Sequence, residues 1–172
     1  FIKFVEKTPS FGKTFICFDD KNNRSILNKI KNQNVITYGI NEKSNFRIKN
    51  VKLQTIFSKF DLEVSLPNQK KKLFKALKIP LLGIHNIKNC CASIAVALTM
   101  GISINLIKRS ISKFKGVQRR FNFIFEHNDS FYYDDYAHHP TEINELLKST
   151  RNVFKSKKII SVFQPHRISR LN

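Results

Sequence analysis

Two acids and two histidines lie close together in one short stretch of this sequence. The run YYDDYAHHPTEINELL at 132–147 contains Asp134, Asp135, His138 and His139, and it continues into a helical pattern. Carboxylates and imidazoles at such spacing could perform acid–base chemistry, bind a metal ion or cap the helix. A metal site built from Asp135, His138 and His139 is one alternative, although their spacing matches no standard metal template. Plain turn or capping roles are the other alternative.

A second group of candidate binding residues follows the next apolar run. QPHRISR at 164–170 contains His166, Arg167 and Arg170. Two arginines three residues apart suit a carboxylate or a phosphate, because each guanidinium offers a planar fork of donors. This segment therefore predicts anion binding, with a solvated basic loop as the alternative.

The two groups are predicted to meet at one edge of a sheet. SFYYDD at 130–135 alternates like a strand, Pro140 suits the first position of a helix, and KKIISVF at 157–163 is typical of a covered parallel strand. Together they predict a right-handed βαβ unit over 131–163. Because ligands bind beyond the carboxyl ends of strands in open α/β sheets, we expect one anion-binding crevice there. Its members would be Asp135, Tyr136, His138, His139, His166, Arg167 and Arg170.

An α/β arrangement is also predicted for the earlier part of the chain. Strand patterns cover 14–20, 34–39, 46–57 and 59–68, and the last two are expected to be antiparallel. Helical stripes predict one helix at about 85–99, through Ile87, Cys91, Ile94 and Leu98, and a second helix capped by Ser103, through Ile104, Ile107, Ile111 and Phe114. The helix after Pro140 is expected to bury Ile143, Leu146, Leu147 and Val153 or Phe154. A hairpin turning at Asn128–Asp129 then starts a new pattern, so we place a domain boundary near residues 120–128.

The segment GIHNIKN at 83–89 is a further candidate site. Asn86 and Asn89 are neighbours on the first turn of the predicted helix, so both amides can point the same way. An amide offers a donor and an acceptor together, which matches the edge of a purine such as adenine. Judged from these residues alone, an asparagine cap at the start of the helix is the preferred interpretation.

Composition narrows the class of protein. The formal net charge is +19, from 31 basic and 12 acidic residues, which would normally suggest nucleic acid or an anionic membrane as partner. The basic residues are scattered apart from Lys70–Lys72, and many are of types with AT-rich codons. We therefore predict a solvated basic surface and no nucleic-acid partner, and we keep a nucleic-acid-binding module as the alternative.

The cysteines argue against a CxxC site, and the apolar runs argue against a membrane-spanning protein. Cys17, Cys90 and Cys91 form no CxxC pair, and the last two are most simply small core residues of a protein from a reducing, cytoplasmic compartment. No apolar run reaches 18 residues, so no membrane partner is predicted.

Four motifs, taken together, carry a family resemblance. GIHNIKNCCASIAVA, GVQRRF, DDYAHHPTEI and VFQPHRISR occur in the order and approximate spacing of a Mur ligase, and the chain resembles that family over most of its length. Within the family, DDYAHHPTE and QPHR-x-x-R resemble the members that add L-alanine to UDP-N-acetylmuramate. The resemblance implies an α/β fold with two parts: the later part of a central ATP-binding domain at 1–121, and the beginning of a Rossmann-like C-terminal domain at 122–172.

The resemblance also implies roles for particular residues. His85, Asn86 and Asn89 match positions that contact adenine, which replaces the capping interpretation. Arg120 and Asp135 match positions that touch the phosphates or ribose of the nucleotide. Tyr136, His138, Arg167 and Arg170 match the amino-acid and muramoyl site, and the last three would also serve in catalysis by offsetting charge in an anionic intermediate.

The implied reaction is an ATP-dependent amide ligation in cytoplasmic peptidoglycan synthesis. ATP would phosphorylate the carboxylate of UDP-N-acetylmuramate, and the amine of L-alanine would attack the acyl phosphate, with Mg²⁺ present. FGKT at 11–14 lacks the first glycine of a phosphate loop. We therefore expect that loop, the Mg²⁺ ligands and the UDP-binding domain upstream of Phe1, and no ligase activity from these 172 residues alone. Another amino-acid-adding Mur ligase is the alternative within the family.

Overall fold

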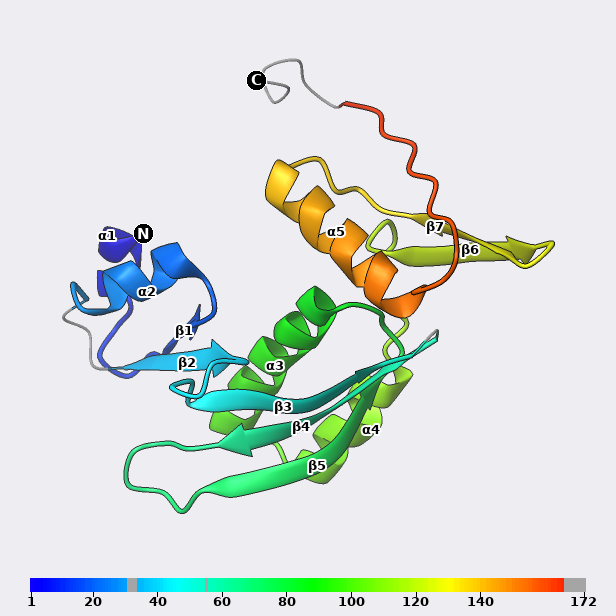
Figure 1. Ribbon diagram of the computed structural model, residues 1–172. Helices are drawn as coiled ribbons and strands as arrows, with labels where there is room; N and C mark the ends of the chain where they lie inside the picture. Colours follow the sequence, from blue (N-terminus) through cyan, green and yellow to red (C-terminus); the bar gives the residue numbers. More distant parts are fainter. Residues whose placement is uncertain (31–33, 55, 166–172) are drawn as a thin grey trace.

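The computed structural model describes residues 1–30, 34–54 and 56–165, and its larger part is built on a mixed five-stranded sheet (Figure 1). The strand order is β1-β2-β3-β4-β5. Their bounds are β1 (Thr14–Cys17), β2 (Val35–Gly39), β3 (Phe46–Leu53), β4 (Ser58–Val64) and β5 (Lys72–Ile79). β1, β2 and β3 run parallel, whereas β4 and β5 pair antiparallel. The sheet thus changes from a parallel to an antiparallel half at β3.

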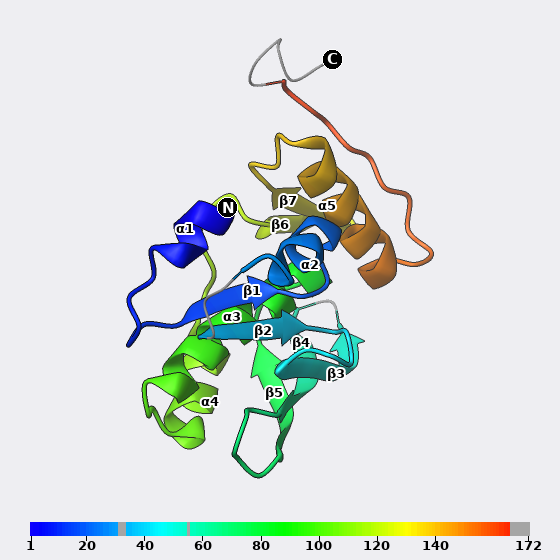
Figure 2. The same cartoon turned by 90° about the vertical axis from the view of Figure 1, so that its left-hand side faces the viewer.

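Two long helices cover one face of this sheet, as Figures 1 and 2 show from two directions. They are α3 (Ile84–Thr99) and α4 (Ile104–Lys113), and the short helices α1 (Ile2–Glu6) and α2 (Lys21–Leu27) lie near β1. The Ser103 hydroxyl accepts a hydrogen bond from the Leu106 N–H, so the predicted cap of α4 is confirmed.

The hydrophobic core lies between the sheet and α3. Alternate residues of β4, such as Phe60 and Leu62, are buried, and they meet the stripe of α3 that contains Ile87, Cys91 and Ile94. Burial of aliphatic and aromatic side chains on this scale is the main favourable contribution to folding. The predicted period of α3 is therefore confirmed.

The opposite face of the antiparallel half carries an unusual row of charge. Lys52, Lys59 and Lys78 are direct cross-strand neighbours on β3, β4 and β5. Like charges directly opposite each other destabilise a sheet. The Nζ atoms of Lys59 and Lys78 lie 5.3 and 4.2 Å from the centroid of the Phe57 ring, and this cation–π contact offsets part of the repulsion.

A smaller unit follows α4. It consists of the hairpin β6 (Asn122–His127) and β7 (Ser130–Asp134) and the helix α5 (Pro140–Val153). Asn128 and Asp129 both have positive φ, 46° and 60°, as the predicted two-residue hairpin turn requires. The Phe154 ring lies 5.4 Å from the Phe131 ring and 5.9 Å from the Tyr133 ring, so aromatic contacts join the end of α5 to the hairpin.

One predicted element is wrong. Residues 158–163 form no strand, and Ile160 and Val162 are exposed, so the structure contains no βαβ unit over 131–163. Within the described residues β7 pairs only with β6. A continuous apolar strand is stable in a sheet that is covered on both faces, whereas the sheet here has only the two strands β6 and β7, and most residues of β6 are exposed.

Two further details differ from the sequence interpretation. β5 was not predicted, because a bulge near Ala76, which has φ of 56°, breaks its alternation. Leu147 is exposed although it was expected on the buried face of α5, and Ser149 is buried in its place. No helix of the described residues has both the length and the apolar character needed to cross a membrane.

Candidate functional site

A cleft of about 760 Å³ separates the start of α3 and the end of α4 from α5. Figure 1 shows that the first turns of α3 lie at the end of that helix nearer to α5. Part of the cleft wall is apolar, through Ile79, Leu81, Ile111, Phe114 and Leu146. The five residues assigned to a nucleotide by the sequence resemblance all line it, namely His85, Asn86, Asn89, Arg120 and Asp135. They come from two units that are separate in the chain.

The first turn of α3 presents the two asparagines to the cleft. Gly83 caps the helix with φ of 89° and ψ of 148°, a backbone conformation open to glycine, so the asparagine cap preferred from the residues alone is wrong. The Asn86 amide Nδ2 donates to the Leu82 carbonyl at 2.8 Å, which fixes the orientation of its buried side chain. Asn89, one turn later, is exposed.

His85 lies beside the asparagines in an environment that favours its neutral form. Burial lowers its pKa, the nearby Arg120 acts in the same direction, and Asp135 and Glu145 oppose the shift. Its buried Nδ1 atom has no hydrogen-bond partner within the part of the chain that the structure describes. The imidazole therefore offers a neutral ring to the cleft at neutral pH.

Asp135 joins two segments of the smaller unit. Its Oδ2 accepts from the Phe121 N–H and its Oδ1 accepts from the Ala137 N–H, each at 2.6 Å. The Tyr136 N–H donates to the Arg119 carbonyl at 2.8 Å. These bonds attach the segment before β6 to the loop after β7, so they hold the backbone on both sides of Arg120 beside this loop.

Glu142 also lines the cleft, although the sequence analysis did not name it as a site residue. Its carboxylate lies 4.0 Å from Arg120 Nη1, accepts from the His138 N–H at 3.3 Å and lies 3.8 Å from His138 Nδ1. Partial burial opposes ionisation, but the N–H groups of His138 and His139 and the charges of His138 and Arg120 lower the pKa of Glu142. A glutamate three residues after the cap His139 is the capping-box pattern, and this signal could have identified it.

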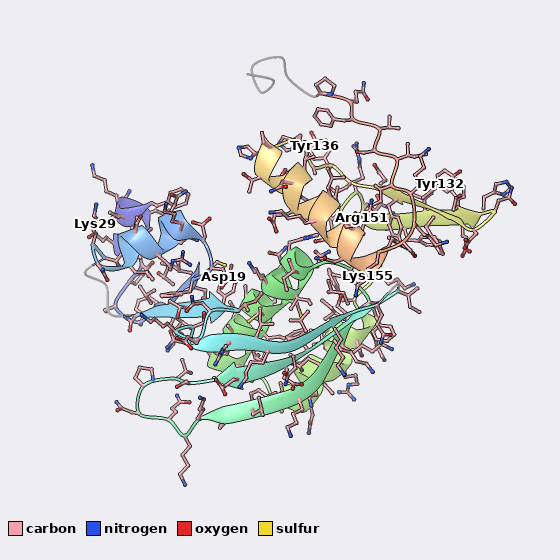
Figure 3. The ribbon with its side chains drawn as sticks, in the orientation of Figure 1. Asp19, Lys29, Tyr132, Tyr136, Arg151 and Lys155 are labelled. Atoms are coloured by element: carbon pink, nitrogen blue, oxygen red, sulfur yellow. The ribbon has the colours of Figure 1, made fainter. Side chains whose placement is uncertain are left out.

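Tyr136 and His138 lie next to the cleft, at the start of α5, where Figure 3 labels Tyr136. His138 Nδ1 lies 2.9 Å from the Tyr136 carbonyl oxygen, and the two rings are 5.1 Å apart. Arg167 and Arg170, together with His166, lie outside the described residues. Their predicted meeting with His138 stays a prediction.

The alternative metal site finds no support in the geometry. His139 caps α5 through its Nδ1, which accepts from the Thr141 N–H at 3.4 Å, while both oxygens of Asp135 accept backbone N–H groups. Within residues 1–30, 34–54 and 56–165, no three His, Cys, Asp or Glu side chains are placed to hold a metal ion together.

The two adjacent cysteines differ in position. Cys91 is fully buried in the core, as expected, whereas Cys90 is half-buried and lines the cleft. Burial raises the pKa of the Cys90 thiol to about 12. Cys90 is therefore a neutral part of the wall and not a nucleophile.

Comparison with protein families identifies both units. Residues 1–97 match the Mur ligase middle domain, and residues 119–171 match the Mur ligase, glutamate ligase domain. The UDP-N-acetylmuramate--L-alanine ligase of Pelagibacter ubique (strain HTCC1062) is 57% identical over 99% of this chain, and that of Rhizobium etli is 41% identical over 99%. The chain covers 37% and 36% of these two relatives, so it spans little more than a third of their length.

Solved structures agree with this assignment. The UDP-N-acetylmuramate-alanine ligase from Thermotoga maritima aligns with a TM-score of 0.66 at 26% identity, over 96% of this chain and 44% of that one. MurF from Acinetobacter baumannii aligns with a TM-score of 0.71 at 21% identity, over 86% of this chain and 31% of that one. The second similarity concerns the fold alone.

Proposed function

The chain belongs to the Mur ligase family, and we propose that the protein containing it is an ATP-dependent ligase that joins L-alanine to UDP-N-acetylmuramate in peptidoglycan synthesis. The observation that carries the substrate assignment is the 57% identity to a ligase of that name over nearly the whole chain. The chain spans 37% of that relative, so the complete reaction belongs to the longer protein.

The cleft supports the nucleotide part of this proposal. A purine base is flat and has a polar edge, and the cleft combines an apolar wall with the amides of Asn86 and Asn89. The neutral ring of His85 adds a flat surface without a charge to desolvate. His85, Asn86 and Asn89 would hold the base, and Asp135 and Arg120 would lie toward the ribose and the phosphates.

The chemistry proposed is activation of a carboxylate followed by attack of an amine. ATP converts the carboxylate of UDP-N-acetylmuramate into an acyl phosphate, and the amine of L-alanine displaces the phosphate. Positive groups that face the anionic intermediate lower the barrier. His138 is one candidate among the described residues, and Arg167 and Arg170 are proposed to complete the set.

Mg²⁺ would supply charge neutralisation to the phosphates. The described residues offer no group of acids or histidines for it, so we assign it no ligand in this chain. A cytoplasmic location is part of the proposal, because ATP and the UDP-sugar are available there.

The test is ADP release by the full-length protein with UDP-N-acetylmuramate, ATP and Mg²⁺. We expect turnover that depends on L-alanine and is weaker with glycine or L-serine. Turnover only with a later peptide precursor and a different amino acid would instead favour another Mur ligase. A folded preparation that releases no ADP with any of these amino acids would overturn the proposal.

A pair of variants tests the assignment of the cleft. Asn89→Ala should raise the KM for ATP about tenfold, because an amide that contacts the base is worth on the order of 1 kcal/mol or more. Asn144→Ala, on an exposed position of α5, is the matched control and should leave that KM unchanged. Equal KM values for the two variants would remove Asn89 from the nucleotide site.

A further inference from the structure

Gly83, the cap of α3, lies close to Ser149 of α5. A Cβ atom built on Gly83 would lie 3.1 Å from the Ser149 Cβ and 3.0 Å from His85 Nδ1. Neither distance leaves room for an ordinary contact. The glycine is therefore enclosed by the buried serine of α5 on one side and by the candidate base-binding histidine on the other.

Ser149 is the buried end of the face that α5 turns to the cleft. Thr141, Glu142, Glu145 and Leu146 line the cleft at helical spacing, and Ser149 continues the same stripe one turn later. It is 1% exposed, and it is the buried residue of α5. A small side chain thus occupies a close contact between the two units.

This contact carries two unsatisfied polar atoms. The Ser149 hydroxyl and His85 Nδ1 are both buried, and neither has a hydrogen-bond partner among the described residues. Buried polar groups without partners are unfavourable. The contact between α5 and Gly83 is therefore held by close fit and not by polar bonds, so its stability should depend on side-chain size.

We propose that Ser149 is a positioning residue whose small size lets α5 close onto Gly83 and so confines the His85 ring in the nucleotide cleft. The inference rests on the proposed nucleotide site and adds to it a residue of α5 that acts through His85. A larger side chain at position 149 would hold α5 away and leave the ring mobile and hydrated. The approach of α5 to Gly83 does not require a hydrogen bond from the Ser149 hydroxyl.

The charges around His85 give this closure a pH signature. Asp135 and Glu145 face the ring from the smaller unit and favour its protonated form, while Arg120 and burial favour the neutral form. When α5 is held away, burial decreases and the pKa of His85 rises toward its ordinary value of 6.5. The closed arrangement is thus fully favoured above that pH and is weakened as the pH falls below it.

The experiment measures binding of a non-hydrolysable ATP analogue to the full-length protein by calorimetry. Ser149→Ala should bind within about twofold of the wild type, while Ser149→Val and Ser149→Leu should bind progressively more weakly, by about tenfold or more for leucine. Asn144→Leu introduces the same leucine side chain at an exposed position of α5. It is the matched control and should bind the analogue as tightly as the wild type. The melting temperature of each variant separates local from global effects, and valine decides the outcome if the leucine variant does not fold.

The pH dependence provides the readout that a purely structural serine would not change. The affinity of Ser149→Val should fall between pH 7.5 and about 5.5 more steeply than that of the wild type, and adding His85→Gln should remove the difference. Weak binding by Ser149→Ala, or normal binding by folded Val and Leu variants, would overturn the inference. Binding is measured without the sugar or the amino acid, so failure of L-alanine-dependent turnover would count against the proposed function alone.

Discussion

In the sheet unit and in the β6–β7–α5 unit, an aspartate that follows a strand accepts hydrogen bonds from backbone N–H groups. Asp19, after β1, accepts hydrogen bonds from the N–H groups of Ile40 and Asn41 at 3.0 Å and pairs with Lys88 Nζ at 3.0 Å. Asp135, after β7, accepts from Phe121 and Ala137. Figure 3 labels Asp19 near the first turns of α3, on the sheet side of the molecule.

The surroundings of the two aspartates differ. Asp19 lies beside a core in which Phe46, Phe60 and Leu62 are fully buried. The hairpin beside Asp135 leaves Phe123, Phe125 and Tyr132 about half exposed. The sheet unit is therefore stabilised mainly by packing, whereas the smaller unit depends more on a few hydrogen bonds and charges.

The largest expected effect tests packing in the sheet unit. Phe60→Ala should lower the free energy of unfolding by about 3–5 kcal/mol, because it removes a buried ring and leaves a cavity. Phe123→Ala, the same change on the exposed hairpin, should cost under about 1 kcal/mol. Urea unfolding of the full-length protein compares them, and equal losses would contradict the distinction between the units.

The second effect concerns the hydrogen bonds of Asp135. Asp135→Ala leaves the Phe121 and Ala137 N–H groups without their acceptor, at a cost of about 2 kcal/mol, and should weaken nucleotide binding at least tenfold by releasing Arg120. The neighbour Asp134 makes a more exposed pair with Arg119 at 3.6 Å, so Asp134→Ala should change both quantities little. Calorimetric binding of an ATP analogue by both variants would decide, and similar losses would contradict the role of Asp135.

The third effect is a pH dependence in the sheet unit. Burial disfavours the charged form of Asp19, but the N–H groups of Ile40 and Asn41 and the Lys88 ammonium together lower its pKa below the ordinary 3.8. Its contribution is therefore complete above pH 3.8 and is lost as the pH falls through the lower folded value. Asp19→Asn should destabilise by about 1–2 kcal/mol at neutral pH, and the difference from the wild type should shrink in acid. A difference that is constant with pH would refute this assignment.

The smallest effect concerns Glu142. Glu142→Gln keeps the side chain nearly isosteric but removes the charge that faces Arg120 and His138, and should cost about 0.5 kcal/mol of stability. The pKa of Glu142 lies below its ordinary 4.5, so the wild-type advantage is present above that pH and disappears as the pH falls through the folded value. Thermal melts in low and high salt would measure it, and an effect as large as that of Asp135→Ala would show that the charge does more than order the start of α5.

The sequence predicted the packed sheet unit better than the smaller unit. Helical periodicity and the Ser103 cap predicted α3 and α4, because those helices bury one stripe against a continuous core. The bulge near Ala76 concealed β5. The strand expected at 157–163 was wrong because apolar composition alone does not supply the neighbouring strands that such a segment needs.

The candidate site shows a similar limit. The motifs grouped His85, Asn86 and Asn89 and connected them to Arg120 and Asp135, and the structure places all five around one cleft. Ser149 and Gly83 could not be identified, since a small residue has no chemistry of its own and its importance comes from the approach of a distant segment. Predictions from residue types therefore find groups that bind, but not the contacts that set their distance.

The lysine row on β3, β4 and β5 has a consequence for how the protein responds to ionic strength. In dilute buffer of about 0.01 M the screening length is roughly 30 Å, so Lys52, Lys59 and Lys78 repel one another fully, whereas at 0.15 M it is about 8 Å. Salt weakens surface ion pairs, but it relieves this repulsion. The repulsion along this row should therefore be largest in nearly ion-free water and should weaken as dissolved ions are added.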